Sequence, residues 1–230
     1  MQQNSNSIQT MKAGLILLLL IVAAAGVAAG TPLDLRGPWH FRMDPKDEGL
    51  AVGWTTNALP DRIHLPTTTD LAGFGAPEPD PNPGFLSREH KFVGAAWYQR
   101  EIAIPETWRG REVELFLERV LWESRAWVDG RESGAQDSLG TPHVHALGKL
   151  TPGRHTLTLR IDNRMIHPLG DRGHCYTDFT QTIWNGAMGK IELRAREALS
   201  LGLVRVFPDA GQGKVETEVT LDNTTGAAFS

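Results

Sequence analysis

The chain has 230 residues with 27 acidic and 23 basic side chains, so its formal net charge is -4. It lacks the basic excess of nucleic-acid-binding proteins, and its 40% apolar and 22% charged residues exclude disorder over most of its length. A single cysteine, Cys175, excludes an internal disulfide framework and a cysteine-rich zinc module. The 24 glycines, 14 prolines and 7 tryptophans instead favour an all-β protein with many turns.

The first thirty residues predict a secretory signal peptide. Lys12 precedes an uncharged run over residues 13–29, which has an apolar core and ends in small residues. We expect cleavage near Ala29 and export to the periplasm or the extracellular space. An uncleaved membrane anchor is the alternative, although such a run is at the short end for a helix that spans a bilayer.

Alternation with period two dominates after residue 30, and helical periodicity is scarce. Strands are predicted at 98–104, 112–118, 124–128, 156–162 and 190–193. Asp129-Gly130 stands between two strand-like runs and indicates a type I′ hairpin, because that turn needs positive φ at both central positions. Leu157, Leu159 and Ile161 share one face of their strand. Short strands at this spacing, with Pro and Gly turns between them, predict a β-sandwich or jelly roll.

Two stretches mark the organisation of the chain. Residues 75–84 hold four prolines and predict a stiff extended loop, which either frames a site or acts as a spacer. A boundary is expected near residue 198, after which strand patterns resume at 201–207 and 214–221. These are too few strands for a sandwich. We therefore expect a jelly-roll domain over 31–198 and the beginning of a second, truncated domain over 199–230.

Five segments, in order and with matching spacing, resemble the N-terminal sugar-binding domain of glycoside hydrolase family 2, the group of β-galactosidases, β-glucuronidases and β-mannosidases. These segments are Leu35–Phe41, Trp97–Gly110, Trp127–Arg131, Leu150–Arg164 and Thr180–Leu193. The resemblance implies a galactose-binding-like jelly roll followed by an immunoglobulin-like β-sandwich and a (β/α)8 barrel. In that family the barrel carries two catalytic glutamates of a retaining mechanism. The barrel is not in this sequence, so the resemblance implies that these residues are non-catalytic.

The resemblance also implies that the segment before Trp184-Asn185 lies at the rim of the sugar pocket. Better-known members have a substrate-binding aspartate where this chain has Thr180, and Asp178 is displaced by two positions. Asp178, Thr180, Gln181 and Asn185 offer donors or acceptors for sugar hydroxyls, and Trp184 could stack on a sugar ring. The alternatives are a core or inter-domain aromatic for Trp184 and a turn residue for Asp178.

A metal site is a weaker hypothesis. His143 and His145 are two residues apart, so they share a face of a strand, and His155 or Cys175 could complete a zinc ligand set. The resemblance implies no metal here, and we expect neither a metal nor a cofactor. The polar loop 165–180 is either the edge of a pocket or a surface loop without a ligand.

We therefore expect the non-catalytic N-terminal part of an exported, β-galactosidase-like exo-glycosidase. Its partners would be a terminal β-linked sugar and the downstream barrel of the same polypeptide, with no nucleic acid. The domain would support the barrel and lend a loop to the sugar site. The alternatives are a free-standing carbohydrate-binding or adhesion module and a purely structural sandwich. The sequence leaves open which sugar is bound and whether the protein is a homo-oligomer.

Overall fold

The computed structural model describes residues 31–78, 88–178 and 183–225. It divides this part of the chain into two units, one spanning Gly30–Ala195 and another containing Arg196–Ser230. The predicted signal segment and part of the proline-rich loop lie outside the described residues. Within the described ranges there is no helix with the length and hydropathy needed to cross a membrane.

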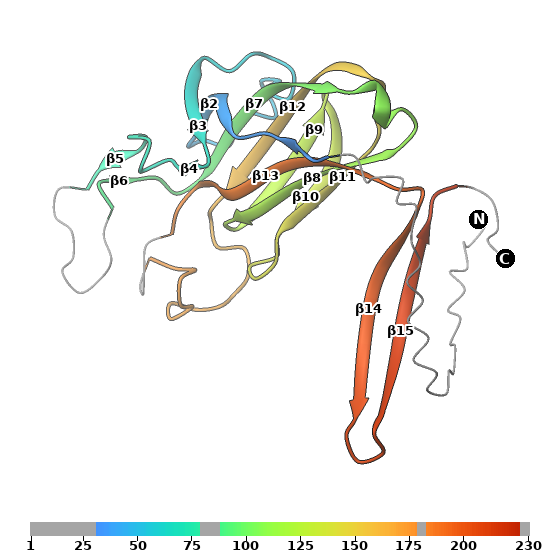
Figure 1. The fold of residues 1–230 in the computed structure, drawn as a ribbon. Helices are drawn as coiled ribbons and strands as arrows, with labels where there is room; N and C mark the ends of the chain where they lie inside the picture. Colours follow the sequence, from blue (N-terminus) through green and yellow to red (C-terminus); the bar gives the residue numbers. More distant parts are fainter. Residues whose placement is uncertain (1–30, 79–87, 179–182, 226–230) are drawn as a thin grey trace. The chain divides into compact units, whose positions relative to one another are not determined.

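Six antiparallel strands form the first sheet of the larger unit, in the order β10-β9-β12-β7-β2-β3 (Figure 1). Their bounds are Gly37–Asp44 for β2, Asp61–Leu65 for β3, Ala95–Ile104 for β7, Glu123–Val128 for β9, Arg131–Gln136 for β10 and Gly153–Asp162 for β12. The predicted strands at 98–104, 124–128 and 156–162 all lie within this sheet.

A second antiparallel sheet packs against the first, in the order β1-β13-β8-β11, with β4 also paired to β13. Its strands are β1 (Leu33–Asp34), β4 (Thr67–Thr68), β8 (Glu112–Val120), β11 (His143–Lys149) and β13 (Gly186–Arg196). Outside the two sheets are the short β5 (Ala76–Pro77), β6 (His90–Lys91) and the 3-10 turn η1 (Glu106–Trp108). This architecture confirms the predicted all-β sandwich.

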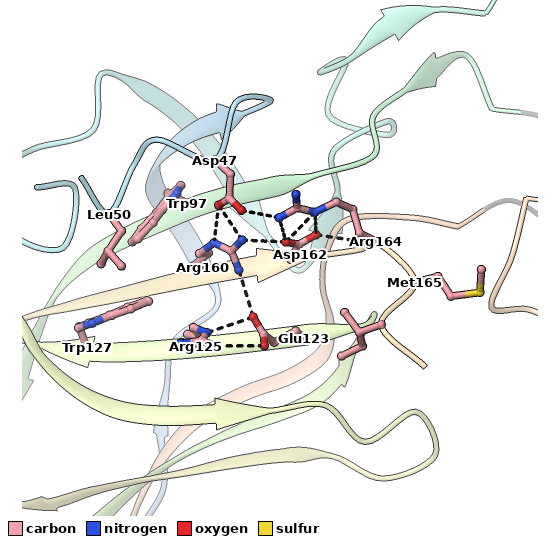
Figure 2. A pocket seen from close by; sticks show the side chains of 11 residues that line it. Asp47, Leu50, Trp97, Glu123, Arg125, Trp127, Arg160, Asp162, Arg164 and Met165 are labelled. Atoms are coloured by element: carbon pink, nitrogen blue, oxygen red, sulfur yellow. Dashed lines mark hydrogen bonds and ion pairs between the residues drawn. The ribbon is translucent and has the colours of Figure 1, made fainter. Parts of the chain in front are cut away.

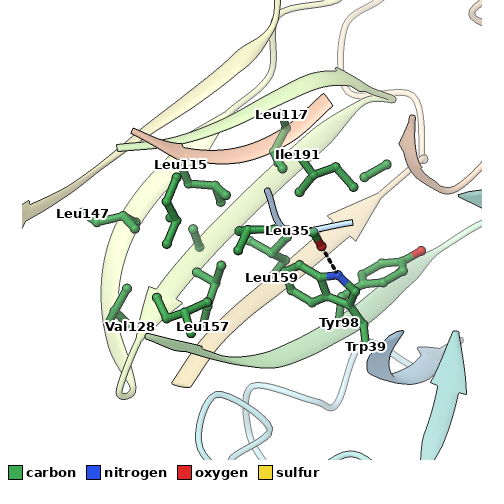
Figure 3. Packing of buried hydrophobic residues seen from close by; sticks show 14 of the residues in the cluster. Leu35, Trp39, Tyr98, Leu115, Leu117, Val128, Leu147, Leu157, Leu159 and Ile191 are labelled. Atoms are coloured by element: carbon green, nitrogen blue, oxygen red, sulfur yellow. Dashed lines mark hydrogen bonds between the residues drawn. The ribbon is translucent and has the colours of Figure 1, made fainter. Parts of the chain in front are cut away.

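The core lies between the two sheets (Figure 3). Leu157, Leu159 and Ile161 are all fully buried in it, which confirms the face predicted from their alternation. Trp39 of β2 is equally buried, and its indole Nε1 donates to the Leu35 carbonyl at 2.9 Å. That hydrogen bond satisfies the one polar atom of a large apolar side chain, so Trp39 fills the core without leaving an unpaired donor.

The hairpin between β9 and β10 has the predicted turn. Asp129 has φ of 50° and Gly130 has φ of 79°, so both central positions are left-handed. The Asp129 carboxylate accepts from the Thr156 backbone N–H at 2.7 Å, and its other oxygen lies 2.6 Å from His155 Nδ1. These contacts fasten the turn to β12.

The outer face of the six-stranded sheet is also covered over part of its area. Trp97 and Trp127 stack there with ring centroids 5.2 Å apart, and Trp54 meets Trp97 edge-on. Asp44 holds the covering segment in place, because its carboxylate accepts from the Trp97 indole and from the backbone N–H of Gly49, at 2.9 and 2.8 Å. Residues 45–59 therefore form a lid over two tryptophans that would otherwise face solvent.

The unit that contains Arg196–Ser230 shows an amphipathic hairpin, formed by β14 (Leu199–Asp209) and β15 (Lys214–Asn223). The strand register places most of its exposed aliphatic side chains on one face: Leu201, Val204, Val206, Val215, Val219 and Leu221. Phe207, which pairs with Glu216, lies on the opposite face. Arg205 pairs with Glu218 on the opposite face. A two-stranded hairpin is only marginally stable by itself in water. Hairpins of this kind gain stability when further strands or a helix pack on their apolar face.

Substituting Gly49 tests the covering segment. A Cβ at Gly49 would lie 2.4 Å from Trp97 Nε1 and 2.5 Å from Trp54 Cε3. We expect Gly49→Ala to lower the free energy of unfolding by roughly 1–3 kcal/mol, the usual cost of overpacking. Urea denaturation measures this, with Gly140→Ala as the control because nothing lies within 4 Å of its Cβ. Equal stability of the two variants would show that the segment is not packed as described.

Candidate functional site

A buried arginine holds the segment that the resemblance assigns to the sugar site. Arg88 Nη2 donates to the two carboxylate oxygens of Asp178 at 3.1 and 3.0 Å, and its Nη1 donates to the Ile183 carbonyl. The Arg88 side chain is 4% exposed and that of Asp178 is 29% exposed. Asp178 also accepts from the Ile183 backbone N–H at 3.1 Å. Residues 178 and 183 are thus both fixed to one guanidinium group.

Two further charged side chains complete this cluster. Lys91 Nζ lies 3.6 Å from the Asp178 carboxylate and 3.7 Å from that of Glu78. Two cations and two carboxylates therefore lie together, so their formal charges cancel. The exposed part of Asp178 can accept hydrogen bonds from hydroxyl groups. Sequence reasoning missed Arg88, Lys91 and Glu78, and the charged run that begins at Arg88, after the proline-rich loop, was the available signal.

Asn185 occupies the interior of the domain. Its side-chain Oδ1 accepts from the Tyr98 hydroxyl at 2.8 Å, and its Nδ2 donates to the carbonyls of Gly94 and Ile161, both at 2.9 Å. Both Asn185 and Tyr98 are buried, and burial raises the pKa of the Tyr98 hydroxyl well above its usual range. The Asn185 amide was expected to meet sugar hydroxyls, but it is fully occupied inside the protein, so it is not available to a ligand.

A second asparagine acts on the same stretch of backbone. Asn163 Oδ1 accepts from the Gly94 N–H at 2.8 Å, and its Nδ2 donates to the Phe92 carbonyl at 2.9 Å. Asn163 and Asn185 therefore hold Gly94 from two sides, directly before β7. Both belong to segments that carry the family resemblance, and both have a structural role here.

Trp184 is half-buried and packs against a small apolar cluster. Leu121, Trp122 and Ile183 form the buried part of this cluster, and Tyr176 also contacts it. Trp184 is thus packed against these neighbours, and part of its side chain remains exposed. Thr180 and Gln181 lie outside the described residues.

The loop before Asp178 is tied to the body of the domain. The Tyr176 hydroxyl donates to the Leu139 carbonyl at 3.0 Å, and the Trp122 indole donates to the Tyr176 carbonyl at 3.2 Å. Thr177 Oγ1 donates to the Asp171 carbonyl at 2.8 Å. Cys175 is exposed on this loop, with φ of 67°.

The two histidines considered for zinc are fully buried and share one hydroxyl. Ser124 Oγ lies 2.7 Å from His143 Nδ1 and 2.8 Å from His145 Nε2. His143 Nε2 faces the Ser138 carbonyl at 2.9 Å, so that nitrogen carries the proton. Ser124 then donates to His143 and accepts from His145, which is a chain of neutral groups.

The buried position of these hydrogen-bonded groups explains the protonation state of the histidines. Burial lowers the pKa of His143, and burial, reinforced by repulsion that a proton on the nearby His143 would exert, lowers the pKa of His145 to about 4. Across the described ranges, no three His, Cys, Asp or Glu side chains are placed to hold a metal ion. The arrangement thus serves packing inside the sandwich.

Comparisons with known proteins give a relation over part of the chain. No family model matches. The sequence is 24% identical over 135 residues to a protein of Paenibacillus borealis, an alignment that covers 58% of this chain. The similarity supports a glycoside hydrolase-related domain. That relative is a β-glucuronidase, and the alignment covers 21% of it, so the chain spans about a fifth of the relative's length.

The structure gives a consistent result. It superposes on β-glucuronidase from Ruminococcus gnavus in complex with D-glucaro-d-lactam with a TM-score of 0.62 at 19% identity, over 85% of this chain and 34% of that one. Another R. gnavus β-glucuronidase structure gives a TM-score of 0.57 at 14% identity, over 84% and 38%. At these identities the likeness shows the shared β-sandwich fold.

Breaking the buried pair should loosen the segment around Asp178. We expect Arg88→Met to lower the free energy of unfolding by on the order of 2 kcal/mol, less than the roughly 3–5 kcal/mol of a fully buried pair because Asp178 is partly exposed. Urea denaturation measures the change. Arg109→Gln is the control, since Arg109 pairs with Glu106 on the surface and its loss should leave stability unchanged. An Arg88→Met variant as stable as the control would show that Arg88 does not fix Asp178 and Ile183 as described.

The buried histidines predict a loss of stability in acid. In the unfolded chain a histidine binds a proton near pH 6.5, whereas folded His145 stays neutral down to about pH 4. Stability from this residue is therefore complete above pH 6.5 and falls between pH 6.5 and 4, by up to roughly 3 kcal/mol. Urea titrations at several pH values should show this slope. It should shrink in His145→Gln and persist in His64→Gln, whose side chain is exposed.

Proposed function

We propose that this chain is the non-catalytic N-terminal part of an exported family 2 exo-glycosidase. In this proposal the sandwich supports a catalytic barrel encoded further along the same polypeptide. The segment fixed by Arg88 and Asp178 contributes to the rim of the sugar site. The substrate class is a terminal β-linked sugar, with β-glucuronides as the first choice because the relatives found are β-glucuronidases.

One observation carries the proposal: the sequence similarity to a β-glucuronidase over 135 residues. The five segments described above support the same family. A retaining glycosidase needs two carboxyl groups about 5–5.5 Å apart. The site cluster instead pairs its carboxylates Asp178 and Glu78 with Arg88 and Lys91, so a supporting role suits it better than a catalytic one.

The geometry of Asp178 suits a supporting contact to sugar. Its carboxylate is fixed by Arg88 and by the Ile183 N–H, yet it remains partly exposed. A fixed acceptor loses little conformational entropy when it binds a hydroxyl group. Asp178 is therefore the residue of this chain for which we propose direct contact with the substrate.

The hairpin β14–β15 supports a longer protein. Its apolar face is exposed along both strands, and we propose that further strands of an immunoglobulin-like domain cover it. The uncharged run at residues 13–29 supports export through a signal peptide cleaved near Ala29.

Activity of a longer gene product tests the proposal. We expect the protein extended through the downstream coding sequence to hydrolyse 4-nitrophenyl β-D-glucuronide, and the 230-residue chain to be inert. Asp178→Asn in the extended protein should raise KM more than it lowers kcat, because the contact would form in the bound state as well as in the transition state. Hydrolysis by the short chain, or a downstream sequence without a barrel, would refute the proposal.

A further inference from the structure

A second polar site lies on the outer face of the six-stranded sheet. It is an open pocket of about 570 Å³, within the roughly 300–1,000 Å³ of small-molecule sites. Strands β7, β9 and β12 supply its floor, and the segments that follow β2 and β12 supply its walls (Figure 2). The pocket shares no lining residue with the Asp178 cluster, and nothing in the proposed function uses it.

A network of ion pairs forms the polar part of this pocket. Arg160 is at its centre, with guanidinium nitrogens 2.7 Å from Asp47, 3.1 Å from Glu123 and 2.8 Å from Asp162. Arg164 also donates to Asp47 and Asp162. Because several strands and the covering segment hold these groups, their positions are fixed before any ligand arrives.

The formal charges of this ion-pair network sum to zero. Three carboxylates line the pocket together with three guanidinium groups: Asp47, Glu123, Asp162, Arg125, Arg160 and Arg164. Burial opposes ionisation of Asp47 and Asp162, but hydrogen bonds from the neighbouring arginines outweigh it and hold the pKa of both carboxyl groups below the usual range. The acids therefore stay charged, and the pocket attracts neither anions nor cations as a class.

Some donors and acceptors of this ion-pair network remain accessible to solvent. The side chains of Arg125 and Arg164 are partly exposed. One oxygen of Glu123 accepts from Arg125 only at the long distance of 3.5 Å. Donors and acceptors thus stand side by side at the surface, which suits groups that both donate and accept, as hydroxyls do.

Apolar side chains stand beside this polar floor. Leu50 is 60% exposed on one wall, and Met165 and Ile166 are 47% and 44% exposed on the other. The stacked pair of Trp97 and Trp127 lies at the Leu50 end (Figure 2). Sugar rings combine C–H faces with a border of hydroxyl groups, so they match aliphatic walls beside a charge-balanced floor.

We propose that this pocket binds a neutral carbohydrate. The ring faces lie against Leu50, Met165 and Ile166, and the hydroxyl groups bridge Arg125, Glu123 and Arg164. Because the lining holds three acids and three arginines, it offers a charged sugar no net attraction to offset the loss of its hydration, so neutral sugars are preferred. This site is independent of the proposed glycosidase function.

Calorimetric titration of the full chain with cellotriose tests the proposal, with D-glucuronate and D-glucosamine as charged comparisons. We expect saturable binding of cellotriose that is tighter than that of either charged sugar. Arg125→Gln and Ile166→Ser should each raise Kd by roughly tenfold. Arg109→Gln and Val144→Ser are matched exposed controls outside the pocket, and they should bind like the parent chain.

Three results would overturn the proposal: no binding of cellotriose, tighter binding of a charged sugar, or equal binding by Arg125→Gln and Arg109→Gln. Thermal unfolding of each variant is recorded in parallel, and the two arginine variants decide the question if Ile166→Ser unfolds. Asp178→Asn separates the two sites. Loss of cellotriose binding in Asp178→Asn, with binding retained in Arg125→Gln, would place the sugar at the Asp178 cluster and refute the pocket.

Discussion

The buried amide of Asn185 connects the two sheets at the end where the candidate sugar segment lies. It precedes β13 of the five-stranded sheet, and its partners Tyr98 and Ile161 belong to β7 and β12 of the six-stranded sheet. An unpaired amide in this position would cost about 1–3 kcal/mol, so each of these hydrogen bonds constrains the geometry. Two residues before Asn185, the Ile183 carbonyl accepts from Arg88, which also binds the Asp178 carboxylate.

The polar clusters of the sandwich follow a common rule. Arg88 with Asp178, Arg160 with its three acids, and Ser124 with its two histidines each pair most of their buried or half-buried polar atoms inside the domain, although Arg88 Nε and His145 Nδ1 have no hydrogen-bond partner among the described residues. What differs is the remaining exposure. The histidine chain is sealed and contributes only to packing. The Asp178 cluster and the outer pocket keep part of their polar surface open, and for this reason both are proposed as ligand sites.

The two units differ in how completely their apolar surface is covered. In the sandwich, Leu157, Trp39 and their neighbours are enclosed between two sheets. In the hairpin β14–β15, Leu201 and Val219 stand exposed on one face. The hydrophobic effect scales with the apolar area removed from water, so the first unit has a core of its own, whereas the hairpin leaves its apolar face exposed. That contrast agrees with the proposed place of this chain in a larger enzyme.

The sequence by itself determined several of the strands, among them β7, β8, β9 and β12, together with the Asp129-Gly130 turn and the buried face of β12, because alternation and turn conformation depend on neighbouring residues. Only the tertiary structure decided that Asn185 faces the interior and that Arg88 pairs with Asp178, a residue 90 positions away. The outer pocket likewise joins Asp47 to Arg160 across 113 positions. Such pairs depend on strand register and on the order of strands in the sheet, which local patterns do not encode.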